Sequence, residues 1–223
     1  ANAASEMGAF AFTRWRLFFA MCLLWLAALY VGRWPELTFD AIAWLSLSSW
    51  IGILVGDTAL FVCMNRLGPR RSGVLFATHA LFSALFAWVF FGETLWGWTL
   101  MGSGVLVSGV MVATLWGRRE EETHAWENTS GALWMGVAMG LLAAVGQAVA
   151  TLMMKPLMST GLDAVSASAV RATASFAAHV LLLWCGLGLS QLKNPLNWKN
   201  LLNTALSATV SMVIGMTLIL QAL

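Results

Sequence analysis

Charged residues are scarce in this chain of 223 residues. Lys, Arg, Asp and Glu make up 10% of the sequence, whereas they make up about 25% of an ordinary soluble domain. Hydrophobic residues make up 60%, and the mean hydropathy is +0.79. A soluble fold of this length would turn most of its surface toward water, and so few charges cannot cover it. The composition therefore excludes an ordinary cytosolic globular protein and favours lipid as the solvent.

Several kinds of functional site are also missing from the sequence. The formal net charge is only +2 and no basic run exceeds two residues, so we expect no binding of nucleic acid. The cysteines, Cys22, Cys63 and Cys185, share no close spacing that indicates a metal site or a disulfide framework. We expect no cofactor and no metal ion. The motifs of zinc and serine hydrolases are absent, which argues against a membrane-embedded enzyme.

What the sequence does contain is long apolar runs. A helix needs about 20 apolar residues to cross a hydrocarbon core of about 30 Å. Seven runs reach that length, and breaks with charged residues, Pro or Gly separate them, as at residues 66–71 and at Lys155-Pro156. The runs cover approximately residues 9–32, 39–64, 71–92, 95–116, 131–154, 162–189 and 198–223. We therefore predict an all-α fold, a polytopic membrane helix bundle.

Two segments recur at nearly equal distances along the chain. Residues 56–60 resemble residues 215–219, which lie 159 residues further on, and residues 6–14 resemble residues 163–171, 157 residues further on. Two nearly equal offsets predict a duplicated unit, and many transporters are built from such repeats. Some of the runs lack a repeat partner within the chain. We therefore expect the chain to cover the middle of a longer protein.

Three segments carry a family resemblance. They are Gly56-Asp57-Thr58 through Asn65-Arg66-Leu67-Gly68, the apolar run 81–91 with its ending Gly92-Glu93, and Gly102-Ser103-Gly104 through Gly109-Val110. They resemble the EamA family of the drug/metabolite transporter superfamily, whose carriers have ten helices in two five-helix halves. One departure is His79-Ala80, where the family commonly has a proline.

The resemblance implies a domain organisation and a function. The first repeat would occupy residues 1–117 without its first helix, a polar linker residues 118–130, and the second repeat residues 131–223 without its last two helices. The protein would be a carrier that exports small polar metabolites, such as amino acids, by alternating access. Its partners would be a small-molecule substrate and the lipid of a bacterial inner membrane, with a homodimer as one assembly to test. A membrane-embedded enzyme, a channel and a non-transporting scaffold subunit are the alternatives.

Ionisable groups within the apolar runs are costly to bury, so each is a candidate for the substrate pathway. Asp57 could take up a proton or bind a substrate amine, or it could pair locally near a loop. Arg14 and Arg171 occupy matching positions in the expected halves and could bind a carboxylate or phosphate. Arg14 lies near its helix start, however, and could instead extend its charge to the membrane surface.

Uncharged polar groups and glycines complete the set of candidates. His79 lies within the run 71–92, where it could line a cavity or pack with its hydrogen bonds satisfied. His179 is a weaker candidate, because nothing at the repeat-related position supports it. Gln147 could bind substrate or join two helices. Three residues are expected to have structural roles: Gly56, Gly92 and Glu93.

Overall fold

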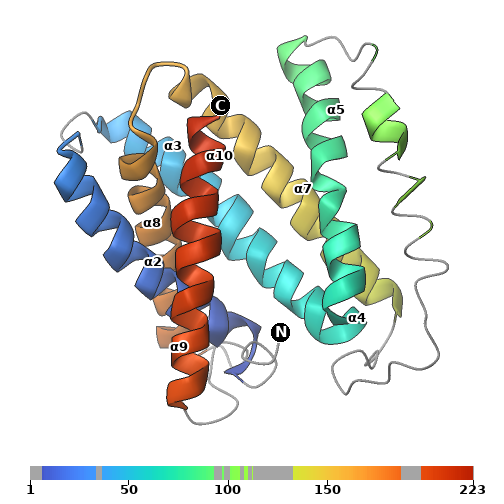
Figure 1. Cartoon of the computed structure of the whole chain (residues 1–223), viewed down its shortest axis with the longest axis horizontal. Coiled ribbons are helices and arrows are strands. Elements are labelled where there is room, and N and C mark those ends of the chain that lie inside the picture. Colours follow the sequence, from blue (N-terminus) through green and yellow to red (C-terminus); the bar gives the residue numbers. More distant parts are fainter. Residues whose placement is uncertain are drawn as a thin grey trace.

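The computed structural model describes residues 7–33, 37–92, 97, 101–105, 108–109, 112, 133–186 and 197–222, and these residues contain helices and no strand (Figure 1). The long elements are α2 (Ala9–Val31), α3 (Phe39–Ser49), η2 (Trp50–Asp57), α4 (Thr58–Ala77), α5 (His79–Phe91), α7 (Leu133–Met158), α8 (Ala164–Trp184), α9 (Trp198–Ser207), η4 (Ala208–Gly215) and α10 (Met216–Gln221). Most of the expected span 95–116 lies outside the described residues, as does Glu93.

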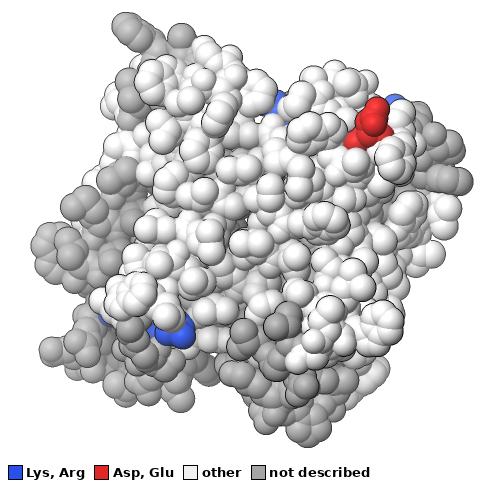
Figure 2. Space-filling model, turned by 180° about the vertical axis from the view of Figure 1, so that it is seen from behind, with Lys and Arg blue, Asp and Glu red and all other residues white. Residues whose placement is uncertain are grey.

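Within the described residues, five helical stretches are long and apolar enough to cross a membrane: Phe10–Val31, Phe39–Phe91, Leu133–Met158, Ala164–Trp184 and Trp198–Gln221. Large apolar side chains such as Leu26, Tyr30 and Val210 face outward. Figure 2 shows a broad uncharged surface with a few charged side chains near its edges. These features confirm the prediction of an all-α polytopic membrane bundle, because lipid can cover an apolar surface that water cannot.

The stretch Phe39–Phe91 contains 53 residues, which is far more than one crossing needs. It reverses direction at Gly68, whose φ of 81° and ψ of 161° are not helical. Glycine adopts a positive φ without a Cβ clash, and Pro69 then begins the next helix, where its missing N–H is no loss. The turn expected at residues 66–71 is therefore present, and the stretch forms two arms that diverge from this corner (Figure 1).

The second arm is interrupted at Thr78, between α4 and α5. The backbone N–H of Thr78 bonds to the carbonyl oxygen of Leu75 at 3.2 Å, and its hydroxyl donates to the same oxygen at 2.6 Å. A hydroxyl that bonds to a carbonyl of the preceding turn competes with the regular α-helical ladder. The helix is thus broken beside His79, although the proline common in the family is absent.

The break expected at Lys155-Pro156 is wrong. α7 continues through Pro156 to Met158, and the chain turns at Ser159–Gly161. A proline removes one backbone hydrogen bond from a helix, and this loss falls near the helix end. The N–H of Ser159 still bonds to the carbonyl oxygen of Lys155 at 3.1 Å, so the final turn is kept.

α2 and α8 pack against each other through small residues. Ala20, Ala28, Ala169 and Ala172 are fully buried in one cluster. The indole N–H of Trp25 adds a hydrogen bond to the hydroxyl of Thr173 at 2.8 Å. Small side chains allow helices to approach closely in lipid, where no hydrophobic effect drives their association. α2 also packs against α9 and η4, while α8 packs against α3 and η2.

η2 and α7 also approach each other closely. A Cβ atom at Gly52 would lie 2.6 Å from the Cβ atom of Ala150. The fully buried hydroxyl of Ser48 also donates to the carbonyl oxygen of Ala150 at 3.1 Å. Only a residue without a side chain fits at Gly52, and the close contact holds Asp57, the last residue of η2, near α7.

The segments η2 and η4 are π-helices, a rare form that occurs often at functional sites. The distance along the chain is 158 residues both from Trp50 to Ala208 and from Asp57 to Gly215. This value lies between the two offsets at which sequence segments recur. Each π-helical segment lies within a longer apolar helix, between α3 and α4 or between α9 and α10 (Figure 1).

Candidate functional site

Arg16 and Asp57 form an ion pair between α2 and the end of η2. Arg16 is 8% exposed and the side chain of Asp57 is 16% exposed. The Arg16 guanidinium carbon also lies 4.9 Å from the centre of the Phe61 ring, within the range of a cation–π contact. A charge that leaves water needs such partners, because solvation lost on burial must be replaced.

Arg171 lies on α8 beside this ion pair and is 4% exposed. Its guanidinium acts electrostatically on the Asp57 carboxylate, as does that of Arg16. The position that a Cβ of Gly52 would occupy is 3.6 Å from Arg171 Nη2 and 3.5 Å from the Gln147 side-chain oxygen. Side chains of α7 and α8 therefore meet at the backbone of η2.

His179 lies further along α8 and is 1% exposed. Its Nδ1 lies 2.9 Å from the carbonyl oxygen of Ser175. A carbonyl only accepts hydrogen bonds, so Nδ1 carries the proton and Nε2 is the acceptor in the neutral ring. The Thr58 hydroxyl, 3.4 Å from Nε2, is placed to donate to it. Arg14 and Arg16 both act electrostatically on this ring.

These contacts define the central polar cluster, which consists of Arg14, Arg16, Asp57, Thr58, Gln147, Arg171 and His179. Its residues come from α2, η2, α4, α7 and α8. The Nε atoms of Arg16 and Arg171 are both buried and have no hydrogen-bond partner within the part of the chain that the structure describes. The Asp57 carboxylate therefore pairs directly with Arg16 and lies near the guanidinium of Arg171, and neither guanidinium has all its donors satisfied among the described residues.

Five of the residues singled out from the sequence lie in this cluster: Arg14, Asp57, Gln147, Arg171 and the weaker candidate His179. Gly56 lies beside them at the approach of η2 to α7, because a Cβ there would be 3.6 Å from the carbonyl oxygen of Ala143. Gly92 lies apart at the end of α5, where its φ is 65°.

The described contacts of His79 are local. Its Nδ1 lies 3.0 Å from the carbonyl oxygen of Phe76, and its ring stacks on that of Phe76 with centroids 5.1 Å apart. α4 ends at Ala77 and α5 begins at His79, so His79 lies directly after the break at Thr78.

Sequence reasoning missed Arg16 and gave little weight to His179. The repeat offset directed attention to Arg14, yet Arg16 lies deeper in the same apolar run. One signal was available: Asp57 is an acidic residue far inside a run, and a buried carboxylate needs a cation nearby. Arg16 and Arg171 are the cations that the fold brings to it.

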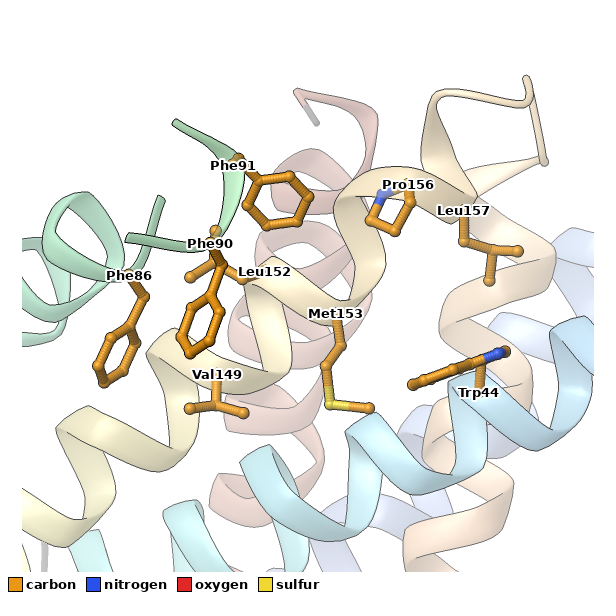
Figure 3. Close-up of a pocket in the computed structure, with 9 residues that line it drawn as sticks. All are labelled: Trp44, Phe86, Phe90, Phe91, Val149, Leu152, Met153, Pro156 and Leu157. Carbon is orange, nitrogen blue, oxygen red and sulfur yellow. The ribbon is translucent and has the colours of Figure 1, made fainter. Parts of the chain in front are cut away.

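A second feature is an apolar groove between α3, α5 and α7, with a volume of about 450 Å³. Figure 3 shows Phe90 of α5, Met153 of α7 and Trp44 of α3 around it. Its nine lining residues carry no charged side chain, so it differs in chemistry from the central polar cluster. Among the described residues, no group of three His, Cys, Asp or Glu side chains could hold a metal ion.

Comparison with known families gives a match to the EamA-like transporter family over residues 2–115. No curated protein and no solved structure gives a match. The matched segment contains Arg14, Arg16 and Asp57, and members of this family are membrane transporters of the drug/metabolite type. With its apolar membrane-spanning helices, the chain belongs to the EamA-like transporter family and is a multi-pass membrane protein.

Proposed function

We propose that this protein is a carrier that exports small polar metabolites, such as amino acids, by alternating access, with the central polar cluster as its binding site. The observation that carries the proposal is the Arg16–Asp57 ion pair beside Arg171. Burying each ion costs several kcal/mol, and this chain, only 10% of whose residues are charged, brings three of them together between its helices. Ionisable groups in this situation commonly mark a transport pathway.

The two expected halves meet at the cluster. α2 and η2 belong to the first half and supply Arg16 and Asp57, while α7 and α8 belong to the second half and supply Gln147 and Arg171. A substrate that binds between them can exchange protein–protein contacts for protein–substrate contacts, and the halves can then rock about the site. We place this carrier in a bacterial inner membrane.

Two structural features support movement around the site. The π-helical segment that ends at Asp57 and the break at Thr78 both interrupt regular α-helical hydrogen bonding. Hinges need a few residues at element ends that can absorb a change in backbone angles. Both interruptions lie in Phe39–Phe91, one in each of its two arms.

The test is metabolite exchange in proteoliposomes loaded with a mixture of polar metabolites, whose loss is followed by mass spectrometry. Wild-type protein is compared with Asp57→Asn and Arg171→Gln. The matched control is Arg70→Gln, because Arg70 is exposed near the Gly68 turn and its loss removes the same charge outside the cluster.

We expect at least one metabolite to leave faster through wild-type and Arg70→Gln protein than through empty liposomes, with saturation at high concentration. Flux through Asp57→Asn and Arg171→Gln should fall at least about tenfold, which corresponds to about 1.4 kcal/mol in the barrier. Unchanged flux in both cluster variants would reject the site. No flux of any metabolite through wild-type protein would reject the carrier function.

A further inference from the structure

We infer that the central polar cluster recognises a carboxylate group on its substrate, held by Arg171. The inference rests on the proposed function, to which it adds the chemical class of the substrate. Arg16 already has Asp57 as its direct ion-pair partner. Arg171 acts on the same carboxylate only at longer range, since no hydrogen bond or salt bridge joins them.

Charge balance supports this assignment. Arg16, Asp57 and Arg171 together carry one excess positive charge, and Arg14 adds a second to the central polar cluster. An uncompensated charge is costly in a low-dielectric interior, where Coulomb energies are several times larger than in water. One bound anionic group would balance the three side chains. A neutral or cationic substrate would leave the excess charge unchanged or increase it.

Within the described part of the chain, Arg171 also has a hydrogen-bond donor that is free to bind an anion. Arg171 is 4% exposed, and its Nε has no partner among the described residues. Guanidinium donors are arranged as a planar fork that matches the two oxygens of a carboxylate. The Gln147 side-chain oxygen lies 3.5 Å from the same Gly52 position, next to Arg171 Nη2; an amide oxygen accepts hydrogen bonds, so the donors for the anion come from Arg171.

The experiment compares carboxylates with their amides, which have nearly the same shape and differ in charge. The probes are succinate and its diamide succinamide, N-acetylalanine and N-acetylalaninamide, and lactate and lactamide, so that each amide lacks any carboxylate. Each probe is tested for competition with the exchange of the transported metabolite and for thermal stabilisation of the purified protein. The variants are Arg171→Gln, Arg171→Lys and Asp57→Asn, with Arg70→Gln as the control.

Wild type and Arg70→Gln should prefer the acid over its amide by at least about tenfold in at least one pair. Arg171→Gln should reduce the preference to about twofold or less, and Arg171→Lys should retain it in part because the charge remains. Asp57→Asn removes a competing carboxylate, so it should bind the acid more tightly even as its flux falls. A merely structural role of Asp57 would not tighten binding.

An equal or stronger response to the amides in wild type would overturn the inference, as would an acid preference that survives in Arg171→Gln. Saturable flux of neutral solutes that depends on Arg171 would leave the carrier function intact and reject the carboxylate site. Acid-selective stabilisation without flux of any solute would support the carboxylate site and reject the carrier function. The two ideas can therefore fail separately.

Discussion

Thr58 and His179 come from different helices and meet within the bundle, with Thr58 Oγ1 3.4 Å from His179 Nε2. Thr58 directly follows Asp57, and His179 lies on the same helix as Arg171. The contact therefore couples the segment that carries the buried carboxylate to the helix that carries the second guanidinium. A relative movement of η2 and α8 must break or rearrange it.

Replacing Thr58 with Val keeps the side-chain shape and removes the hydroxyl that faces His179. We expect a loss of about 0.5–1.5 kcal/mol of stability, the usual net value of one hydrogen bond. Thermal unfolding of the purified protein in detergent measures the change. Thr160→Val is the control, because Thr160 is exposed and water can replace its hydrogen bonds; an equal effect of both variants would contradict the contact.

A double-mutant cycle tests the Arg16–Asp57 pair. Arg16→Gln or Asp57→Asn alone leaves one buried charge without its partner, which should destabilise the protein by about 3–5 kcal/mol. The double variant removes both charges and should be less destabilised than the sum of the single variants. Unfolding in detergent gives the three values. Strict additivity would mean that the two side chains do not interact.

Gly52→Ala tests the close approach of η2 to α7. The added methyl group would lie 2.6 Å from Ala150 Cβ, so the two helices must separate, at an expected cost of about 1–3 kcal/mol. Gly73→Ala is the matched control, because a Cβ at Gly73 meets no atom within 4 Å and alanine favours the helix. Destabilisation that is no larger than in the control would refute this packing.

The three cysteines report on membrane topology. Cys185 is exposed at the end of α8, Cys22 is exposed in the middle of α2, and Cys63 is buried. A polar maleimide added to permeabilised membranes should label Cys185, because only its thiol is expected in contact with water. Cys22 should stay unlabelled in lipid and react after denaturation. Rapid labelling of Cys22 in intact membranes would contradict α2 as a membrane span.

The spans were predictable because their signal depends on composition alone. The first run, residues 9–32, corresponds to α2 at Ala9–Val31, and the last, residues 198–223, to the stretch Trp198–Gln221. The first run ends at Gly32, whose φ is 76°. The end of α7 was not predictable from Lys155-Pro156, because a proline near the last turn removes a hydrogen bond that the helix can lose.

The site was predictable only in part. Asp57 and Arg171 stand out because burying a charge is costly wherever its partner lies. Deciding whether Arg14 or Arg16 pairs with Asp57 required the tertiary structure. Residues two apart on an α-helix are rotated by about 200° about its axis, so they point in nearly opposite directions. The sequence pattern does not show which of these directions faces η2. The local setting of His79 likewise follows from hydrogen bonds at Thr78 that no spacing rule indicates.

The two π-helical segments also determine how the helix after each segment is rotated relative to the helix before it. In a π-helix each N–H bonds five residues back instead of four, so the side-chain directions before Trp50 and after Asp57 do not follow one continuous α-helical wheel. Removing a single residue from this segment would rotate everything after it relative to α3. Thr58 would then turn away from His179. The segment at Ala208–Gly215 places the same constraint on length within the last span.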